Sequence, residues 1–367
     1  MKKRIELGLL YSRSGSYSLI SEACRTGALS AIAEINSMPD LPITFAPIER
    51  DPQGNIDAYG PLCEEILRDS DARHVVGCVT SWSRKEVIPT LEKAGGTLWY
   101  AVPYEGFEAS DHVVYTHACP NQHLLPLLGW AFARLGRRGF LTGSNYIWGW
   151  EMNRLARDVI LSASGEVLGE RYLPLGSLDV ERMINEIRAT RPDFILNNLI
   201  GPSQYAFLEA YHKLGQEDPH FRPETCPILS CNLTECELPA IHPDAVEGLV
   251  AAGPYFRGAT GWPQAQRNFG SSHEAAAWSS VYRLAILLSG HEDAAEQSLA
   301  QLLHDAPQGS EGIDLSTHHT ALPVLIAQVE NGAFAVRERF EAVAGDPYLA
   351  RGRNPIAPGA PRLKVVS

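Results

Sequence analysis

The amino-acid sequence predicts an α/β protein made of two Rossmann-like lobes, each with a parallel β-sheet. Short apolar runs rich in β-branched residues alternate with longer segments of helical apolar spacing, which is typical of βαβ units whose sheet is buried on both faces. This alternation covers about residues 1–118 and restarts over about residues 119–252 with a similar length. A chain of 367 residues is also long enough for two domains, each with its own hydrophobic core.

The first half of the chain supplies strands and helices in alternation. Apolar, β-branched runs predict strands at Ile5–Leu10, Ile43–Ile48, His74–Cys78, Thr97–Val102 and Val113–His117. Apolar residues three and four positions apart predict helices at Leu19–Asn36, Asp57–Arg68 and Lys85–Lys93. The first of these helices carries Ala23, Ala28 and Ala31, which allow close packing.

The second half repeats the same pattern. Strands are predicted at Phe140–Thr142, Glu166–Tyr172, Phe194–Asn198, Ile228–Ser230 and Val246–Ala251. Helices are predicted at Leu124–Leu135, Glu151–Ser162, Asp179–Thr190 and Ser203–Leu214. No low-complexity tract separates the two halves.

The pattern changes after residue 252. Two helices are predicted at Phe269–Leu288 and Ala294–Leu303, and an antiparallel hairpin at Thr320–Val329 and Phe334–Phe340 turns at Asn331-Gly332. Added helices of this kind usually return to the first domain. We therefore expect residues 1–118 with about 256–330 to form the N-terminal lobe, and residues 119–253 with about 331–350 to form the C-terminal lobe. Residues 351–367, rich in Pro and Gly, should be an extended tail.

Composition excludes several classes of function. The net charge of −12 argues against direct nucleic-acid binding, since that affinity comes mostly from Lys and Arg. No run of 18 apolar residues could cross a membrane. The basic start Met1–Arg4 is followed by a short stretch with a charge at Glu6 and by no small-residue cleavage site, so we expect a cytoplasmic protein that starts near Met1. Seven cysteines, an odd number, are expected to be reduced thiols.

The sequence offers no convincing catalytic or metal-binding group. Cys78 ends a predicted strand, but the nearest histidine, His74, lies in the same strand and cannot serve as its base. Phosphate-binding glycine motifs are absent, and the spacing of Cys226, Cys231 and Cys236 matches no zinc site. The pair His318-His319 is expected at the surface. The sequence therefore predicts a protein that is not an enzyme, with no catalytic residue, metal or cofactor.

Polar and aromatic loops follow several predicted strands. They are Tyr11–Ser18, Thr80–Lys85, Tyr100–Glu108 and Gly143–Trp150. Ligands of open α/β sheets lie beyond the carboxyl ends of the parallel strands, so these loops should converge on a ligand cleft between the lobes. Tyr100, Tyr104, Tyr146, Trp148 and Trp150 would bring rigid aromatic walls with polar tips to it. Ser81 begins a helix, where its hydroxyl can cap the helix or receive a polar ligand group, and both roles can coexist at one helix start.

Six motifs carry a resemblance to a known family. They are Val76–Pro89, Tyr100–Glu108, Cys119–Gln122, Gly143–Trp148, Pro254–Phe256 and Asp305–Gly309. In these motifs, and in register over nearly the whole chain, the sequence resembles the AmiC-type amide-sensing negative regulators of bacterial aliphatic amidase operons. These regulators form a cytosolic branch of the type I periplasmic binding proteins, whose cousins bind branched-chain amino acids and urea.

The resemblance implies a function and a set of site residues. Two lobes would close on a short amide, and an RNA-binding transcription antiterminator would be sequestered without inducer and released with it. A homo-oligomer is expected, with no direct contact to nucleic acid or membrane. The implied ligand-binding residues are Ser81, Tyr100, Val102, Pro103, Tyr104, Tyr146 and Trp148.

The chain departs from the family pattern at the first-lobe wall. The family has Tyr-Pro-Thr-Pro-Tyr where this chain has Tyr100-Ala101-Val102-Pro103-Tyr104, so Val102 replaces a hydroxyl with a methyl. Asn145, Trp148 and Gly149 stand where the family has Asp, Tyr and Pro. We therefore expect an amide that is more apolar than acetamide or differently shaped. The alternative function is the solute-binding component of an ABC transporter for amides, urea or branched-chain amino acids, and an amide hydrolase is the least favoured.

Overall fold

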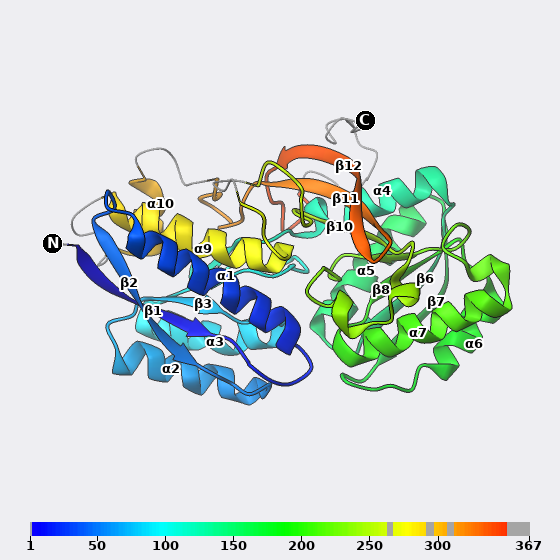
Figure 1. Cartoon of the computed structure of the whole chain (residues 1–367), viewed down its shortest axis with the longest axis horizontal. Coiled ribbons are helices and arrows are strands. Elements are labelled where there is room, and N and C mark those ends of the chain that lie inside the picture. Colours follow the sequence, from blue (N-terminus) through cyan, green and yellow to red (C-terminus); the bar gives the residue numbers. More distant parts are fainter. Residues whose placement is uncertain (1, 263–266, 291–296, 307–311, 351–367) are drawn as a thin grey trace. The chain divides into compact units, whose positions relative to one another are not determined.

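β-Strands and helices alternate through two sheets, and each sheet belongs to its own unit of the chain (Figure 1). The structure, a computed structural model, describes residues 2–262, 267–290, 297–306 and 312–350. Among the described residues, unit 1 comprises residues 2–118 and 260–321, and unit 2 comprises residues 119–259 and 322–350. The predicted α/β class, with a largely parallel sheet in each lobe, is confirmed.

The sheet of unit 1 has five parallel strands in the order β2-β1-β3-β4-β5. Their bounds are β1 (Lys3–Leu10), β2 (Ile43–Arg50), β3 (His74–Gly77), β4 (Thr97–Tyr100) and β5 (Val113–Tyr115). The strands β3, β4 and β5 are buried along their whole length, which explains why they appear in the sequence as continuous apolar runs.

The helices of unit 1 connect these strands and add to them from the later segment. They are α1 (Ser18–Ser37), α2 (Tyr59–Asp69), α3 (Ser81–Ala94), α9 (Ser272–Ser289) and α10 (Leu299–His304), with a short 3-10 turn η1 (Ile56–Ala58) before α2. The helix α9 is buried over most of its residues and packs along α1. These two helices belong to the segment 260–321, which is part of unit 1.

The contact between α1 and α9 depends on a glycine. A Cβ atom at Gly27 would lie 2.1 Å from the carbonyl oxygen of Glu274 in α9, so the two helix backbones approach too closely for any side chain at this position. Replacing Gly27 with alanine in an exposed helix would normally stabilise it by about 1 kcal/mol. Here we expect the opposite sign, a loss of about 1 to 3 kcal/mol in the free energy of unfolding, because the helices must separate.

Urea denaturation followed by circular dichroism measures this loss. The matched control is Thr26→Ala on the exposed side of the same turn, which should leave the free energy of unfolding within about 0.5 kcal/mol of wild type. A Gly27→Ala protein as stable as wild type would show that α1 and α9 are not this close.

The sheet of unit 2 has seven strands in the order β12-β11-β10-β9-β8-β6-β7. The neighbours from β10 to β7 pair in parallel, whereas β11 pairs antiparallel with both β10 and β12. Their bounds are β6 (Arg138–Ser144), β7 (Glu166–Leu173), β8 (Phe194–Asn198), β9 (Ile228–Ser230), β10 (Val250–Gly253), β11 (Leu322–Glu330) and β12 (Ala333–Val343). The predicted hairpin at Asn331-Gly332 is thus the β11–β12 turn.

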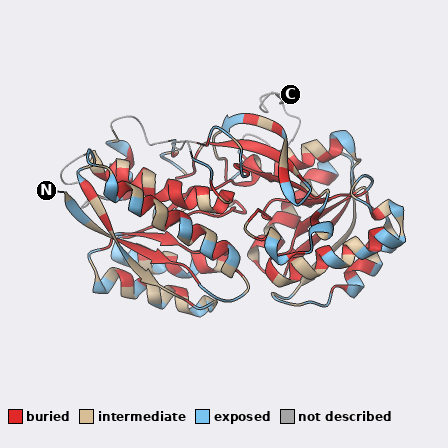
Figure 2. Cartoon of the chain, in the orientation of Figure 1, coloured by how far each residue is buried: buried red, intermediate tan, exposed pale blue. Residues whose placement is uncertain are grey.

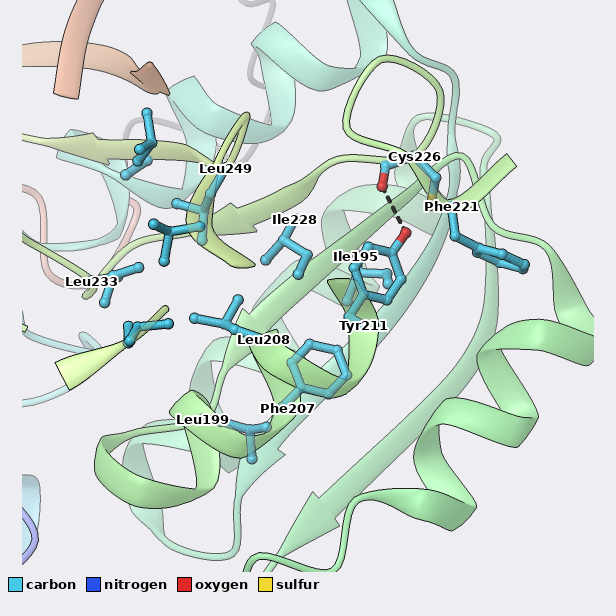
Figure 3. Close-up of a cluster of buried hydrophobic side chains, with 14 of the residues drawn as sticks. Ile195, Leu199, Phe207, Leu208, Tyr211, Phe221, Cys226, Ile228, Leu233 and Leu249 are labelled. Atoms are coloured by element: carbon cyan, nitrogen blue, oxygen red, sulfur yellow. Dashed lines mark hydrogen bonds between the residues drawn. The ribbon is translucent and has the colours of Figure 1, made fainter. Parts of the chain in front are cut away.

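The helices of unit 2 follow the strands in turn. They are α4 (Leu124–Arg134), α5 (Ile147–Ser162), α6 (Glu181–Thr190), α7 (Gly201–Glu217) and α8 (Pro243–Val246), with 3-10 turns η2 (Pro120–Gln122), η3 (Pro219–Phe221) and η4 (Leu238–Ala240). Within each unit the inner strands are mostly buried, whereas much of the edge strands β2, β7 and β12 is half-buried or exposed, as are the outward helix faces (Figure 2). A cluster of buried apolar side chains around Phe207, Leu208 and Tyr211 of α7 fills the core of unit 2 (Figure 3).

The structure differs from the sequence-based expectation at several boundaries. Residues 322–330 form β11 in the sheet of unit 2, whereas the prediction put them in the first lobe. The predicted strand Val246–Ala251 begins only at Val250, because Pro243 at the first helical turn and the capping His242 side chain start α8 instead. Part of the predicted helix Ala294–Leu303 and the whole predicted tail 351–367 lie outside the described residues.

Candidate functional site

The first five predicted ligand-binding residues lie at one edge of the sheet of unit 1. Because β1, β3, β4 and β5 are parallel, their carboxyl ends meet at this edge. Ser81 begins the helix after β3, Tyr100 ends β4, and Val102, Pro103 and Tyr104 follow it. All five are buried. We call this set the unit-1 edge.

The helix start after β3 resolves the two roles that the sequence left open for Ser81. The N-cap of α3 is Thr80, whose side-chain oxygen accepts a hydrogen bond from the Ser83 N–H at 3.1 Å. The Ser83 hydroxyl completes a capping box with the Thr80 backbone. The Ser81 hydroxyl is therefore not needed for capping. It makes no hydrogen bond with the described residues, although the Ser81 side chain is buried.

A buried ion cluster lies directly behind the two tyrosines. Arg84 of α3 is fully buried, and its guanidinium pairs with Glu105 at 2.6 Å and with Glu108 at 2.9 Å. The same guanidinium carbon lies 4.9 Å from the centre of the Tyr100 ring and 4.7 Å from that of Tyr104. Cation–π contacts of a desolvated guanidinium are favourable, so Arg84 fixes both rings. We call Arg84, Glu105 and Glu108 the Arg84 cluster.

The two carboxylates of the Arg84 cluster are balanced by Arg84 and by the neighbouring Lys85. Burial by itself would raise the pKa of Glu108, but Arg84 and Lys85 favour the ionised carboxylate and bring that pKa down to about 2. The Tyr104 hydroxyl donates to the backbone carbonyl of Glu108. The sequence placed Arg84 in the loop Thr80–Lys85 and Glu105 in the loop Tyr100–Glu108. It did not reveal that they form one buried pair, because they are 21 positions apart.

An aromatic stack continues from Tyr104 to a histidine. The Tyr104 and Tyr115 ring centres are 4.6 Å apart, and His319 stacks on Tyr115 at 4.1 Å. His318 and His319 are 4% and 1% exposed, so the prediction of surface histidines is wrong. The physical reason is long-range pairing: the Tyr115 N–H donates to the His318 carbonyl at 2.9 Å and draws this segment onto β5. Burial lowers the pKa of His319 to about 4, so its ring is neutral at pH 7.

Two further groups at the carboxyl ends of β1 and β3 are buried. The Tyr11 hydroxyl follows β1 and has no hydrogen-bond partner among the described residues. Cys78 follows β3 with a φ of 65°, is fully buried, and donates its thiol to the Ser83 carbonyl. Burial raises the pKa of Cys78 well above its ordinary value, so a thiolate nucleophile is not available there.

The other two predicted ligand-binding residues lie in unit 2. Tyr146 precedes α5 and Trp148 lies in its first turn, directly after β6, and both are buried. The Trp148 indole N–H has no hydrogen-bond partner among the described residues. Trp150, which the sequence placed with them, is 43% exposed and donates its indole N–H to Asn145 at 3.0 Å. Helix α5 can start close to β6 because residue 149 is a glycine. A Cβ at Gly149 would lie only 2.1 Å from the Ser144 carbonyl oxygen.

A buried polar chain crosses the carboxyl edge of the unit-2 sheet. Thr142 donates to Asn197, the Asn197 amide donates to Gln204, and the Gln204 amide donates to Glu237 at 3.4 Å. The Tyr205 hydroxyl donates to the same Glu237 oxygen at 3.0 Å. The other Glu237 oxygen, Oε2, has no partner within the described ranges. The sequence analysis missed this chain, because its members come from β6, β8, α7 and a loop after β9.

A second glutamate of the same loop, Glu235, also has a buried carboxylate oxygen without a hydrogen-bond partner in the described chain. Glu235 accepts a hydrogen bond from the Arg257 N–H at 2.6 Å, while its Oε2 is buried without a partner in the described chain. Burial raises the pKa of Glu235 and of Glu237 to about 7. The only sequence signal was the polar stretch Cys231–Glu237 directly after the strand β9. These two carboxyls can each accept or donate one further hydrogen bond near neutral pH.

The described residues contain no group of three or more His, Cys, Asp or Glu side chains that could hold a metal ion. In the same residues, no helix is both long and apolar enough to cross a membrane.

Comparison with known proteins identifies a family and solved structures with a similar fold. The family model of the periplasmic binding protein domain matches residues 5–354. Among solved structures, a solute-binding protein of an ABC transporter from R. palustris in complex with 4-hydroxybenzoate is 18% identical, with a TM-score of 0.77 over 95% of this chain and 99% of that one.

Two further solved structures are similar to a comparable degree. The branched-chain amino acid transporter substrate-binding protein LivJ from Streptococcus pneumoniae, in complex with isoleucine, is 16% identical, with a TM-score of 0.72 over 93% of this chain and 99% of that one. The substrate-binding protein of an amino acid ABC transporter from Pseudomonas fluorescens is 17% identical, with a TM-score of 0.74 over 96% of this chain and 99% of that one. With the family model covering nearly the whole chain, this protein belongs to the periplasmic binding protein family and has its type I fold.

Proposed function

We propose that this protein binds a small uncharged solute, an amide or a related compound, as the solute-binding component of an ABC transporter. The solute-transport role is supported by similar solved structures of this fold that are transporter binding proteins. The chemistry of the ligand is supported by the unit-1 edge. The proposed contacts are Ser81, Tyr100, Val102, Pro103 and Tyr104, with Tyr146 and Trp148 of unit 2.

The single observation that carries the ligand class is the internal pairing of Arg84. A buried guanidinium is a strong site for carboxylates. Here Glu105 and Glu108 already occupy it, at 2.6 and 2.9 Å. The unit-1 edge therefore offers hydroxyls and aromatic faces, and a carboxylate ligand would meet two carboxylates behind the tyrosines. An amide brings a donor and an acceptor without charge, which suits the unpaired Ser81 hydroxyl.

Titration calorimetry with matched amides and acids tests this proposal. Benzamide, butyramide and acetamide should bind, and benzoate, butyrate and acetate should bind at least about tenfold more weakly, because burying an unpaired charge is costly. For a ligand of four heavy atoms, the tightest binding to expect is a Kd of about tens of micromolar. Acids binding as tightly as amides would overturn the proposed ligand class. Acetamide binding tighter than any longer or aromatic amide would overturn the role given to Val102.

Two variants separate contact from folding in the same titration. Tyr100→Ala should weaken amide binding by about tenfold or more. The control is Trp150→Ala, which removes an exposed aromatic side chain and should leave amide binding unchanged. Val102→Thr restores the hydroxyl of the related regulators and should shift preference towards acetamide. Ammonia should not be released from any amide, and its release would favour a hydrolase instead.

A second candidate function is a cytoplasmic amide sensor that regulates an amidase or nitrile-degradation operon through an RNA-binding antiterminator. It is favoured by the residues of the resemblance motifs, since Arg84 from one motif and Tyr100, Tyr104, Glu105 and Glu108 from another form one interlocked cluster. Cell fractionation distinguishes the two roles, because a transporter component acts outside the cytoplasmic membrane and the sensor acts within it. Amide-dependent release of a co-purifying antiterminator would support the sensor. In either role we propose a homo-oligomer, which light scattering tests.

A further inference from the structure

A cavity lies in unit 2 at the edge of its sheet opposite Tyr146 and Trp148. It has a volume of about 360 Å³ and is lined from the C-terminal part of α7 and from the segments that precede β9 and β10. Helix α7 starts after the carboxyl end of β8 and returns towards the amino ends of the strands, so this cavity lies at the amino edge of the sheet. A volume above about 300 Å³ is in the range of small-molecule sites.

The walls of the cavity are apolar and held in place. Tyr211, Phe221, Ile228 and Leu249 are buried side chains of the unit-2 core that also line the cavity (Figure 3). The Tyr211 hydroxyl donates to the Cys226 carbonyl at 2.7 Å, which ties α7 to the segment before β9, as the dashed line in Figure 3 shows. Pre-formed apolar walls of this kind bind the body of a ligand without a large ordering cost.

Two glycines let the surrounding segments close around this space. A Cβ at Gly215 would lie 3.0 Å from the Phe221 carbonyl oxygen, so the segment after α7 packs directly on the helix. Gly248 has a φ of 76°, and a Cβ there would lie 2.3 Å from the Cβ of Pro223. The segments before β9 and β10 therefore touch each other at one end of the cavity.

The mouth of the cavity carries excess negative charge. Three carboxylates, Glu224, Asp244 and Glu247, belong to its lining and are exposed. No Lys or Arg among the described residues pairs with any of them: Asp244 lies 3.8 Å from His242, and Glu247 accepts a hydrogen bond from the Asn331 N–H at 3.2 Å. The one guanidinium in the lining, Arg222, donates its Nε–H to the Gly215 carbonyl at 3.2 Å.

We propose that this cavity is a second binding site, for a small organic cation with an aromatic or aliphatic body, such as an arylalkyl amine. The apolar walls would bury the body, and the three carboxylates would attract the ammonium group at the mouth. The site goes beyond the proposed solute binding and does not depend on it, because it uses none of the residues of the unit-1 edge and lies at the opposite edge of the unit-2 sheet from Tyr146 and Trp148.

The probe is 2-phenylethylammonium, compared with neutral 2-phenylethanol and anionic phenylacetate, by calorimetry and by amide NMR of the whole chain. We expect the ammonium compound to bind with a Kd of about a millimolar or tighter. The phenylacetate should bind at least about tenfold more weakly, and the shifted amide signals should belong to residues 211–228 and 241–249. Equal binding of phenylacetate, signals shifted elsewhere, or no binding at about 20 mM would overturn the proposal.

Variants locate the site and separate it from the solute site. Glu224→Gln should weaken phenylethylammonium binding by about two- to fivefold, whereas Glu209→Gln, an exposed carboxylate on α7 outside the lining, should leave it unchanged. Ala245→Phe, which fills the cavity from α8, should abolish binding, and a melting curve checks that it is folded. Tyr100→Ala should retain wild-type affinity for the cation. Wild-type binding in both Glu224→Gln and Ala245→Phe would place the cation elsewhere and overturn the proposal.

Discussion

Replacing Arg84 with methionine is expected to lower the free energy of unfolding of unit 1 by about 3 to 5 kcal/mol, the usual cost of removing one partner of a buried ion pair. Methionine keeps much of the volume of the arginine side chain but leaves the Glu105 carboxylate, which is 2% exposed, without its cation. It also removes the guanidinium that contacts the Tyr100 and Tyr104 rings. Urea denaturation with hydrogen exchange of unit-1 amides measures the loss.

A triple variant distinguishes the ion pair from packing. Adding Glu105→Gln and Glu108→Gln to Arg84→Met removes the unpaired charges and should recover most of the lost stability. As a matched control, Arg68→Met breaks an exposed pair with Asp69 on α2 and should change little. If Arg84→Met is as stable as wild type, Arg84 does not pair with Glu105 in the buried position.

Replacing Glu237 with glutamine is expected to stabilise unit 2 at pH 8 and to have almost no effect at pH 4.5. Burial raises the pKa of this carboxyl from its ordinary 4.5 to about 7 in the folded protein. The folded state therefore holds the proton more tightly, so stability is fully present below pH 4.5 and is lost as the pH rises through 7. A shift of this size corresponds to about 3 kcal/mol at pH 8, and glutamine, which is always neutral, avoids the loss.

Thermal and urea unfolding between pH 4.5 and 8 measure this difference. Glu209→Gln on the exposed face of α7 is the matched control, and its stability should follow the wild-type pH dependence. Glu235 has a pKa raised to about 7 by the same burial, so Glu235→Gln should show the same sign. Destabilisation of Glu237→Gln at pH 8 would mean that the ionised carboxylate is the favoured form in the fold.

Local pattern predicted those elements whose signal is contained in a few consecutive residues. The strands Phe194–Asn198 and Ile228–Ser230 lie where the apolar runs placed them, because strands buried on both faces are apolar throughout. The strand predicted from Val246 was wrong at its start, since a proline and a cap residue outweigh an apolar run at a helix start. The resemblance motifs identified the type I family, which is confirmed, while the amide regulator stays a proposal.

The sequence predicted where the residues of the candidate site lie better than it predicted their hydrogen bonds and charges. The unit-1 edge brings Ser81, Tyr100 and Val102 together because carboxyl ends of parallel strands meet, which the βαβ alternation already indicated. The sequence did not reveal that Thr80 is the helix cap, or that Glu237 joins a buried hydrogen-bonded chain. Polar residues are solvated by default, and no local pattern marks the few that are buried.

The sequence by itself determined the α/β class, the two sheets and the family, because periodic burial of apolar residues is a short-range property of the chain. Only the tertiary structure decided which charges are buried and paired, which carboxyls stay unpaired, and where α7 and the segments before β9 and β10 enclose a cavity. Those outcomes depend on side chains brought together from distant positions. The pairing of Arg84 with Glu105 and Glu108 belongs to this second group, and it is what makes an uncharged ligand the expected one.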